Sequence, residues 1–287
     1  HEIRTGCRTT KGVTGYDLTR LLVGSGGTLA LVTEATLKLL PAPEAVATLR
    51  VCFASTRDAL DAVSRVMHQS VVPCALEFMD HRAIDAIRPT GTADDLPPGT
   101  RALLMVEADG AVEDLPRQIA ALKQALGGAG LLEIRSGFER DAIAQLWAAR
   151  KSLSNAVKQI APLKINEDVV VPVSQLADFV DFIDHTAHAQ NLAVVSFGHA
   201  GNGNLHVNLM VHPDDADEME RARLAHEAIL LRVLALGGTL SGEHGIGTEK
   251  RRFVPLEIEP ATLAIMRSIK QQFDPHGLLN PGKLFPD

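Results

Sequence analysis

Apolar and polar positions follow two different periods along this chain, and the change of period separates predicted strands from predicted helices. Along residues 49–53 the apolar side chains stand at every second position, which is typical of a half-buried strand. From there to Gln69 they recur every three or four positions, as on a helix that buries one face. Ser55 or Thr56 stands at the start of this segment, and the hydroxyl of either residue can cap a helix.

The alternation of strand and helix continues in two successive rounds. The first round has predicted strands at 75–79, 102–108 and 131–136 and a predicted helix at 111–126 that ends at Gly127-Gly128. The second round has predicted strands at 165–171, 193–198 and 205–211 and predicted helices at 139–160, after Ser174, and between the acidic residues at 214–218 and Gly237. This pattern predicts an α+β fold in which two ferredoxin-like halves share an antiparallel sheet covered by helices.

The first 40 residues have a different composition, rich in glycine and in β-branched side chains. Apolar residues alternate between Leu29 and Leu39, which predicts a strand whose exposed face changes partway. Pro41 and Pro43 then mark a linker.

Composition excludes several classes of protein. The formal net charge of −7 provides no basic field for nucleic acid, and no apolar run approaches the ~20 residues that span a bilayer. Three cysteines without a CxxC pair suit a reducing compartment. We therefore expect a cytoplasmic protein, with peripheral binding to the inner face of the membrane left open. The chain begins at His1 without a methionine, and we expect it to be a fragment.

The densest chemical signal is a glycine- and asparagine-rich turn between two predicted strands, at residues 196–208. His199 lies at its start and His206 on the strand that leaves it, where His206 and Asn208 share one face. The opposite face is apolar and belongs to the core, so we expect the polar face to meet solvent or charge. A surface hairpin with two solvated histidines is the alternative.

A second glycine-rich loop, residues 237–247, contains adjacent Glu243 and His244. Two imidazoles and one carboxylate form a ligand set that leaves a metal position open for substrate. The alternative is a helix carboxyl-terminal turn, which explains Gly237 and Gly238 but not Glu243-His244.

A third cluster lies on the helix predicted at 139–160. Trp147, Arg150 and Ser154 fall on one face, and an arginine in a core-facing stripe requires an anionic partner. Arg150 can bind a carboxylate through two nitrogens, and Lys164 can add a second charge. From spacing alone, two ordinary surface cations are the favoured alternative.

Together these segments resemble the FAD-linked oxidase family related to D-lactate, glycolate and D-2-hydroxyglutarate dehydrogenases, within the vanillyl-alcohol-oxidase-type flavoproteins. The motifs, in chain order, are Thr14-Gly-Tyr-Asp-Leu18, Gly24-Ser-Gly-Gly-Thr28, Leu146-Trp-Ala-Ala-Arg150, Phe197-Gly-His-Ala-Gly-Asn-Gly203, Ser241-Gly-Glu-His-Gly-Ile-Gly247 and Leu279-Asn-Pro-Gly-Lys283. Family members usually have Glu where this chain has Gly26, and Gly where it has Ala30.

The resemblance implies three domains. Residues 1–43 would be the end of an FAD-binding domain and its linker, residues 44–270 a cap domain that binds substrate and metal, and residues 271–287 a segment that returns to the flavin. FAD contacts would fall on the following residues: Gly24, Ser25, Gly26, Gly27, Thr28, Val32 and Asn280.

The resemblance also implies the site. Its metal ligands would be His199, His206 and Glu243, with zinc or manganese as the metal and His244 as the catalytic base. Its substrate contacts would be Arg150, Ser154, Lys164 and Asn208. The implied reaction is FAD-dependent oxidation of a small D-2-hydroxy acid, D-lactate or glycolate, with D-2-hydroxyglutarate as an alternative substrate.

Several alternatives stay open at this point. Electrons could pass to a cytochrome, a quinone, an electron-transfer flavoprotein or an iron–sulfur subunit, and the protein could form a homodimer. A metal-dependent hydrolase would use the same three ligands to hold a metal that activates water, but it would leave the glycine-rich loop at 24–28 without a role. A non-catalytic fragment that binds metal or a partner subunit is a further alternative.

Overall fold

The computed structural model describes residues 2–286 and divides the chain into two compact units. The larger unit is Pro41–Gly242, and the smaller one combines His1–Leu40 with Glu243–Asp287. The domain boundaries implied by the resemblance stay a prediction.

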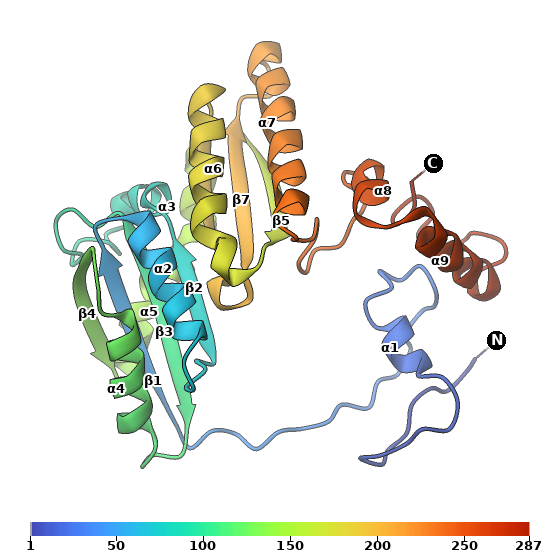
Figure 1. The fold of residues 1–287 in the computed structure, drawn as a ribbon, viewed down its shortest axis with the longest axis horizontal. Coiled ribbons are helices and arrows are strands. Elements are labelled where there is room, and N and C mark those ends of the chain that lie inside the picture. The colour runs from blue at the N-terminus through green and yellow to red at the C-terminus, as the bar shows by residue number, and fades with distance from the viewer. Residues whose placement is uncertain (1, 287) are drawn as a thin grey trace. The chain divides into compact units, whose positions relative to one another are not determined.

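The larger unit is built on an antiparallel sheet whose seven strands run in the order β4-β1-β3-β2-β6-β7-β5 (Figure 1). The strands are β1 (Ala45–Phe53), β2 (Ala75–Met79), β3 (Ala102–Gly110), β4 (Leu131–Gly137), β5 (Leu163–Val170), β6 (Ala193–Gly198) and β7 (Asn204–Val211). The six strands predicted after residue 70 are confirmed, with bounds that differ by at most two residues.

The first half of this sheet has a complete ferredoxin-like topology. Its strands pair as β4-β1-β3-β2, with helices α2 (Thr56–Met67) and α4 (Leu115–Leu126) after β1 and β3. Of the two candidate caps of α2, Ser55 is the N-cap, and its hydroxyl accepts a hydrogen bond from the Asp58 amide at 3.3 Å. Helix α3 (His81–Ile87), which the sequence pattern did not predict, follows β2.

The second half repeats the topology but lacks a full fourth strand. Strand β5, helix α6 (Leu176–Ala189), strands β6 and β7, and helix α7 (Ala216–Ala235) follow in order. In place of a fourth strand, Thr239 forms a single antiparallel bridge to Val170 at the free edge of β5. Antiparallel pairing of β2 with β6 joins the halves, so the predicted shared sheet is confirmed.

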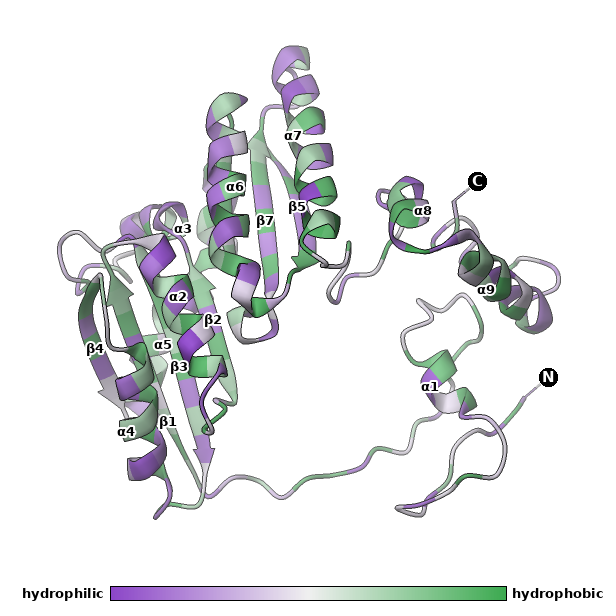
Figure 2. Cartoon of the chain, viewed as in Figure 1, coloured by the Kyte–Doolittle hydropathy of each residue, from purple (hydrophilic) through white to green (hydrophobic). Residues whose placement is uncertain are grey.

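Helices cover both faces of this sheet. Helices α2, α4, α6 and α7 pack on one face, and α3 and α5 (Arg140–Ala156) pack on the other (Figure 1). Hydrophilic and hydrophobic residues alternate along the helices, as α2, α6 and α7 show (Figure 2). In α6 the predicted apolar stripe is buried, at Leu176, Phe179, Val180 and Ile183. The prediction that β1 is half-buried is wrong, because this central strand has helices on both faces and is buried from Ala47 to Phe53.

The smaller unit contains α1 (Leu18–Leu22), α8 (Val254–Glu257) and α9 (Pro260–Phe273). The strand predicted between Leu29 and Leu39 is wrong, since residues 30–43 form neither helix nor strand. A strand needs a neighbour for its backbone hydrogen bonds, and this unit has no other strand among its described residues. Across the chain from residue 2 to residue 286, no helix combines the length and apolar character needed to cross a membrane.

Candidate active site

The glycine-rich turn between β6 and β7 brings His199 and His206 together. Gly203 has a φ of 73°, and a Cβ there would lie 1.9 Å from the Val171 carbonyl oxygen, so only glycine fits this reversal. After the turn, the ring centroids of His199 and His206 are 5.4 Å apart, with the ring planes at 83°. The resemblance implied that these two histidines are neighbours, and their role as metal ligands stays a prediction.

The face of β7 that carries His206 and Asn208 is buried, so the solvated-hairpin alternative is wrong for it. His206 is 8% exposed and Asn208 is fully buried. Asp168 lies opposite His206 on β5, with its Oδ1 atom 3.9 Å from His206 Nδ1. The Asn208 amide donates to the carbonyl oxygens of Val195 and His206, at 3.0 and 3.1 Å. The polar face therefore meets charge rather than water.

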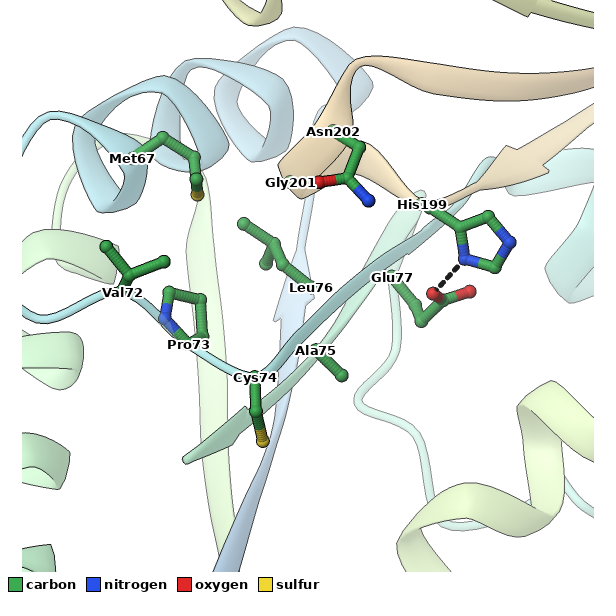
Figure 3. Close-up of a pocket in the computed structure, with 10 residues that line it drawn as sticks. All are labelled: Met67, Val72, Pro73, Cys74, Ala75, Leu76, Glu77, His199, Gly201 and Asn202. Atoms are coloured by element: carbon green, nitrogen blue, oxygen red, sulfur yellow. Dashed lines mark hydrogen bonds and ion pairs between the residues drawn. The ribbon is translucent and has the colours of Figure 1, made fainter. Parts of the chain in front are cut away.

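Glu77 on β2 connects His199 to Arg150, and it is not among the site residues predicted from the sequence. Its Oε1 atom makes a hydrogen bond with His199 Nδ1 (Figure 3). Its Oε2 atom accepts a hydrogen bond from Arg150 Nε at 3.0 Å and forms an ion pair with Arg150 Nη2 at 2.9 Å. The anionic partner that an arginine on this helix face was expected to need is therefore Glu77. The only sequence signal was a carboxylate between the apolar residues Leu76 and Phe78.

The seam between the two halves of the sheet fixes these residues. Phe78 pairs with Gly198 and Met79 with Phe197, so the same register places Glu77 opposite His199. One step further, Asp80 caps α3 through the Ala83 amide and also accepts a hydrogen bond from the Ser196 amide, at 2.7 and 2.6 Å. Burial raises the pKa of Asp80 to about 7.

A small pocket of about 170 Å³ lies beside this seam. Glu77 and His199 line one side of it and Met67, Val72 and Pro73 line the other (Figure 3). Cys74 also lines the pocket, but burial raises the pKa of its thiol to about 11. The thiol therefore stays protonated at neutral pH and is a poor nucleophile.

Two predicted substrate residues lie outside the cluster of Glu77, Arg150 and His199. Ser154 and Lys164 are both exposed, and within residues 2–286 neither has a hydrogen bond or ion pair with Arg150 or Glu77. Lys164 lies on β5 opposite Met210, on the same strand face as Asp168.

Glu243 and His244 begin the second segment of the smaller unit. Both side chains are about half exposed, and His244 Nε2 lies 3.9 Å from Glu243 Oε1. The preceding residue, Gly242, belongs to the larger unit, where a Cβ on it would lie 3.0 Å from Asp168 Oδ1. The grouping of Glu243 and His244 with the two histidines stays a prediction.

In the smaller unit, the residues predicted to contact FAD come together although some 250 positions separate them. The Asn280 amide donates to the Gly26 carbonyl oxygen at 2.7 Å. Gly27 has a φ of 66°, a backbone conformation that favours glycine, and a Cβ on it would lie 2.8 Å from Asn280 Nδ2. Lys270 on α9 donates to the carbonyl oxygens of Thr28 and Leu279, at 2.6 and 2.9 Å. Val32, outside this network, exposes 74% of its surface.

Comparison with known proteins adds independent evidence. Residues 42–284 match a family described as FAD linked oxidases, C-terminal domain. The chain is 36% identical over 283 residues to the glycolate oxidase subunit GlcD of Bacillus subtilis, with 99% of this chain and 60% of that protein covered. It is 30% identical over 286 residues to a probable mitochondrial D-lactate dehydrogenase of Danio rerio, with 99% and 57% covered. The chain thus spans less than two thirds of these relatives.

Solved structures share the fold. p-Cresol methylhydroxylase matches with a TM-score of 0.63 at 12% identity, over 85% of this chain and 53% of that chain. Alkyldihydroxyacetonephosphate synthase matches with a TM-score of 0.59 at 15% identity, over 93% and 49%. At such identities the likeness shows a common fold and nothing about substrate.

Proposed function

The chain belongs to the FAD-linked oxidases, as their C-terminal domain, and from this we propose that it provides the metal and substrate residues of an FAD-dependent D-2-hydroxy-acid dehydrogenase. The names of the relatives, glycolate oxidase subunit and D-lactate dehydrogenase, support D-lactate or glycolate as the substrate, with D-2-hydroxyglutarate as the alternative. The observation that carries the proposal is the edge-on pair of His199 and His206, each with its Nδ1 atom next to a carboxylate.

The donor set fits a zinc- or manganese-like ion. A metal-binding imidazole uses one ring nitrogen for the ion and the other for a carboxylate or carbonyl. His199 has that arrangement with Glu77, and the Nδ1 atom of His206 faces Asp168 Oδ1 at 3.9 Å, beyond hydrogen-bond distance. We propose Glu243 as the third ligand; the position of Gly242 beside Asp168 supports it, because Glu243 is the next residue.

The remaining polar residues would bind the substrate and move its proton. When bound, FAD would accept a hydride and the divalent metal would make the substrate hydroxyl more acidic. His244 would accept the hydroxyl proton, since an imidazole is the commonest general base in enzymes. Arg150 and Lys164 would bind the substrate carboxylate, with Ser154 and Asn208 as further contacts.

The smaller unit would contribute to the flavin site. The backbone of Gly24, Ser25, Gly26, Gly27 and Thr28 would approach FAD closely, next to Val32 and Asn280. The hydrogen bond from Asn280 to Gly26 supports one continuous surface for this contact. On this proposal, residues 1–43 end an FAD-binding domain, residues 44–270 form the cap domain, and residues 271–287 return to the flavin. The electron acceptor would be a cytochrome, a quinone, a flavoprotein or an iron–sulfur subunit.

Metal content after dialysis against Zn²⁺ or Mn²⁺ tests the proposed ligands. We expect about one ion per chain, and we expect His206→Ala to lose it because one of three protein ligands is gone. His188→Ala, an exposed histidine at the end of α6, is the matched control and should keep the ion. Equal metal content in His206→Ala and His188→Ala would remove His206 from the ligand set.

A further inference from the structure

We infer that Glu77 is a positioning residue that orients a metal ligand and the substrate-binding arginine at the same time. The inference rests on the proposed roles of His199 and Arg150. Glu77 is only 8% exposed, and its two oxygens are divided between the two partners: Oε1 for His199 and Oε2 for Arg150.

The contact with Oε1 determines which nitrogen of His199 faces the metal. A carboxylate accepts hydrogen bonds and cannot donate them, so His199 Nδ1 must carry a proton toward Glu77. In the neutral ring the lone pair is then on Nε2, the nitrogen that points away from Glu77 (Figure 3). Glu77 thereby selects the tautomer that can bind a cation through Nε2.

The contact with Oε2 fixes the guanidinium of Arg150. Two of its nitrogens, Nε and Nη2, lie on the same oxygen of Glu77, and the ring of Phe197 lies 5.1 Å from the guanidinium carbon. The third nitrogen, Nη1, makes no hydrogen bond to any residue from 2 to 286. The planar group is thus held in one orientation, with Nη1 left to bind a carboxylate.

The backbone of Glu77 is itself held on both sides. Strand β2 lies between β3 and β6, with Glu77 paired to Met105 of β3. On the other side, the β2–β6 register places Glu77 opposite His199. A carboxylate fixed at this seam couples the metal side of the proposed site to its substrate side.

Replacement of Glu77 by glutamine gives a sharp test. Glutamine has one acceptor and one donor group, and Arg150 offers only donors, so the amide oxygen will turn to Arg150 and the amide nitrogen to His199. His199 Nδ1 must then accept, and the proton moves to Nε2, where it competes with the metal. We expect the affinity for Zn²⁺ and Mn²⁺ to fall about 10- to 100-fold.

Glu107→Gln is the matched control. Glu107 is a partly buried carboxylate on neighbouring β3 that accepts hydrogen bonds from Thr48 and, at 2.9 Å, from Trp147 of α5. The substitution removes one carboxylate charge from the same sheet and one hydrogen bond to α5, the helix of Arg150. Among the contacts that the structure describes, Glu107 has none with His199 or Arg150. We expect it to leave the His199 tautomer and the metal affinity unchanged.

The readouts are nitrogen NMR of His199 in the metal-free chain and titration with Zn²⁺ or Mn²⁺ alone. We expect Nδ1–H in the wild type and Glu107→Gln, and Nε2–H in Glu77→Gln. If Glu77→Gln does not fold, Glu77→Asp is the second variant. It keeps the charge but cannot reach both His199 and Arg150, so we expect its affinity for the metal to fall as well. A wild-type Nε2–H tautomer, or a Glu77 variant with the metal affinity and tautomer of the control, would overturn the inference. A wild type with Nδ1–H that binds neither metal would instead contradict the proposed function.

Discussion

Arg150 shows how much a single residue can be understood from its helix face. Its spacing from Trp147 indicated a core-facing stripe, where an arginine needs an anion, although an ordinary surface cation was the favoured alternative. The ion pair with Glu77 provides that anion. The identity of that anion was not predictable, because Glu77 lies 73 positions away on a strand. Only the pairing of β2 with β6 brings the two halves of the site together.

Arg150→Lys in the full-length protein should impair turnover although the charge is kept. A lysine has a single charged nitrogen and no planar fork, so it cannot hold Glu77 and a substrate carboxylate in the geometry that a guanidinium fixes. Misplacement of this kind costs on the order of 10²-fold in kcat/KM. The measurement is kcat/KM for D-lactate and for its uncharged methyl ester, with exposed Arg140→Lys, on the same helix, as the control. An acid-to-ester ratio equal to that of Arg140→Lys would contradict a role for Arg150 in binding the carboxylate.

At the scale of elements, the periods of two and of three to four residues predicted the strands and most helices of the larger unit. These periods failed to predict the structure correctly in two places. The alternation between Leu29 and Leu39 is a strand pattern, but Leu31, Leu37 and Leu39 are more than three-quarters exposed and have no strand beside them. Helix α3 was missed because its seven residues are too few to show a helical period.

Helix α9 acts as the element that holds the proposed flavin-binding residues. Lys270 contacts Thr28, Leu279 and Asp274, while Asp274 accepts hydrogen bonds from the amides of Leu278 and Leu279 at 3.0 and 2.8 Å. The hydrogen bond from Lys270 lowers the pKa of Asp274 to about 2. Because the folded pKa is depressed, this carboxylate stabilises the fold above the usual Asp value of ~3.9, and the contribution is lost as pH falls toward 2.

Lys270→Met should therefore move the titration of Asp274 upward, toward ~4, because the largest cause of the depressed pKa is removed. The amide signals of Leu278 and Leu279, followed by NMR against pH, report this carboxylate directly. Lys123→Met, in the last turn of α4, is the control and should leave the midpoint at about 2. The same midpoint in both variants would show that Lys270 does not hold Asp274.

At the scale of the whole molecule, the repeated strand–helix pattern was enough to predict two ferredoxin-like halves on one antiparallel sheet. The incomplete fourth strand of the second half was not predictable, since residues 237–247 are mostly glycine and polar residues with no period. The single bridge between Thr239 and Val170 ends the sheet there. The chain then continues through Gly242 beside Asp168 to Glu243 and His244.

The grouping of His199, His206 and Glu243 around one ion, and the role of His244, came from the resemblance and not from spacing. The structure adds the contact between the two imidazoles and the two carboxylates next to them. Spacing could not supply these because Glu77 and His199 are 122 positions apart, and Asp168 and His206 meet only through the register of β5 and β7.

The central claim is that these residues serve FAD-dependent oxidation of a D-2-hydroxy acid, and the most direct measurement is anaerobic bleaching of the flavin in the full-length, metal-loaded protein. D-lactate or glycolate should bleach it rapidly. His244→Asn should slow the bleaching by about 10²–10⁴-fold, as expected for loss of a general base, while its metal content stays that of the wild type. A wild-type flavin that none of D-lactate, glycolate and D-2-hydroxyglutarate reduces would contradict the account.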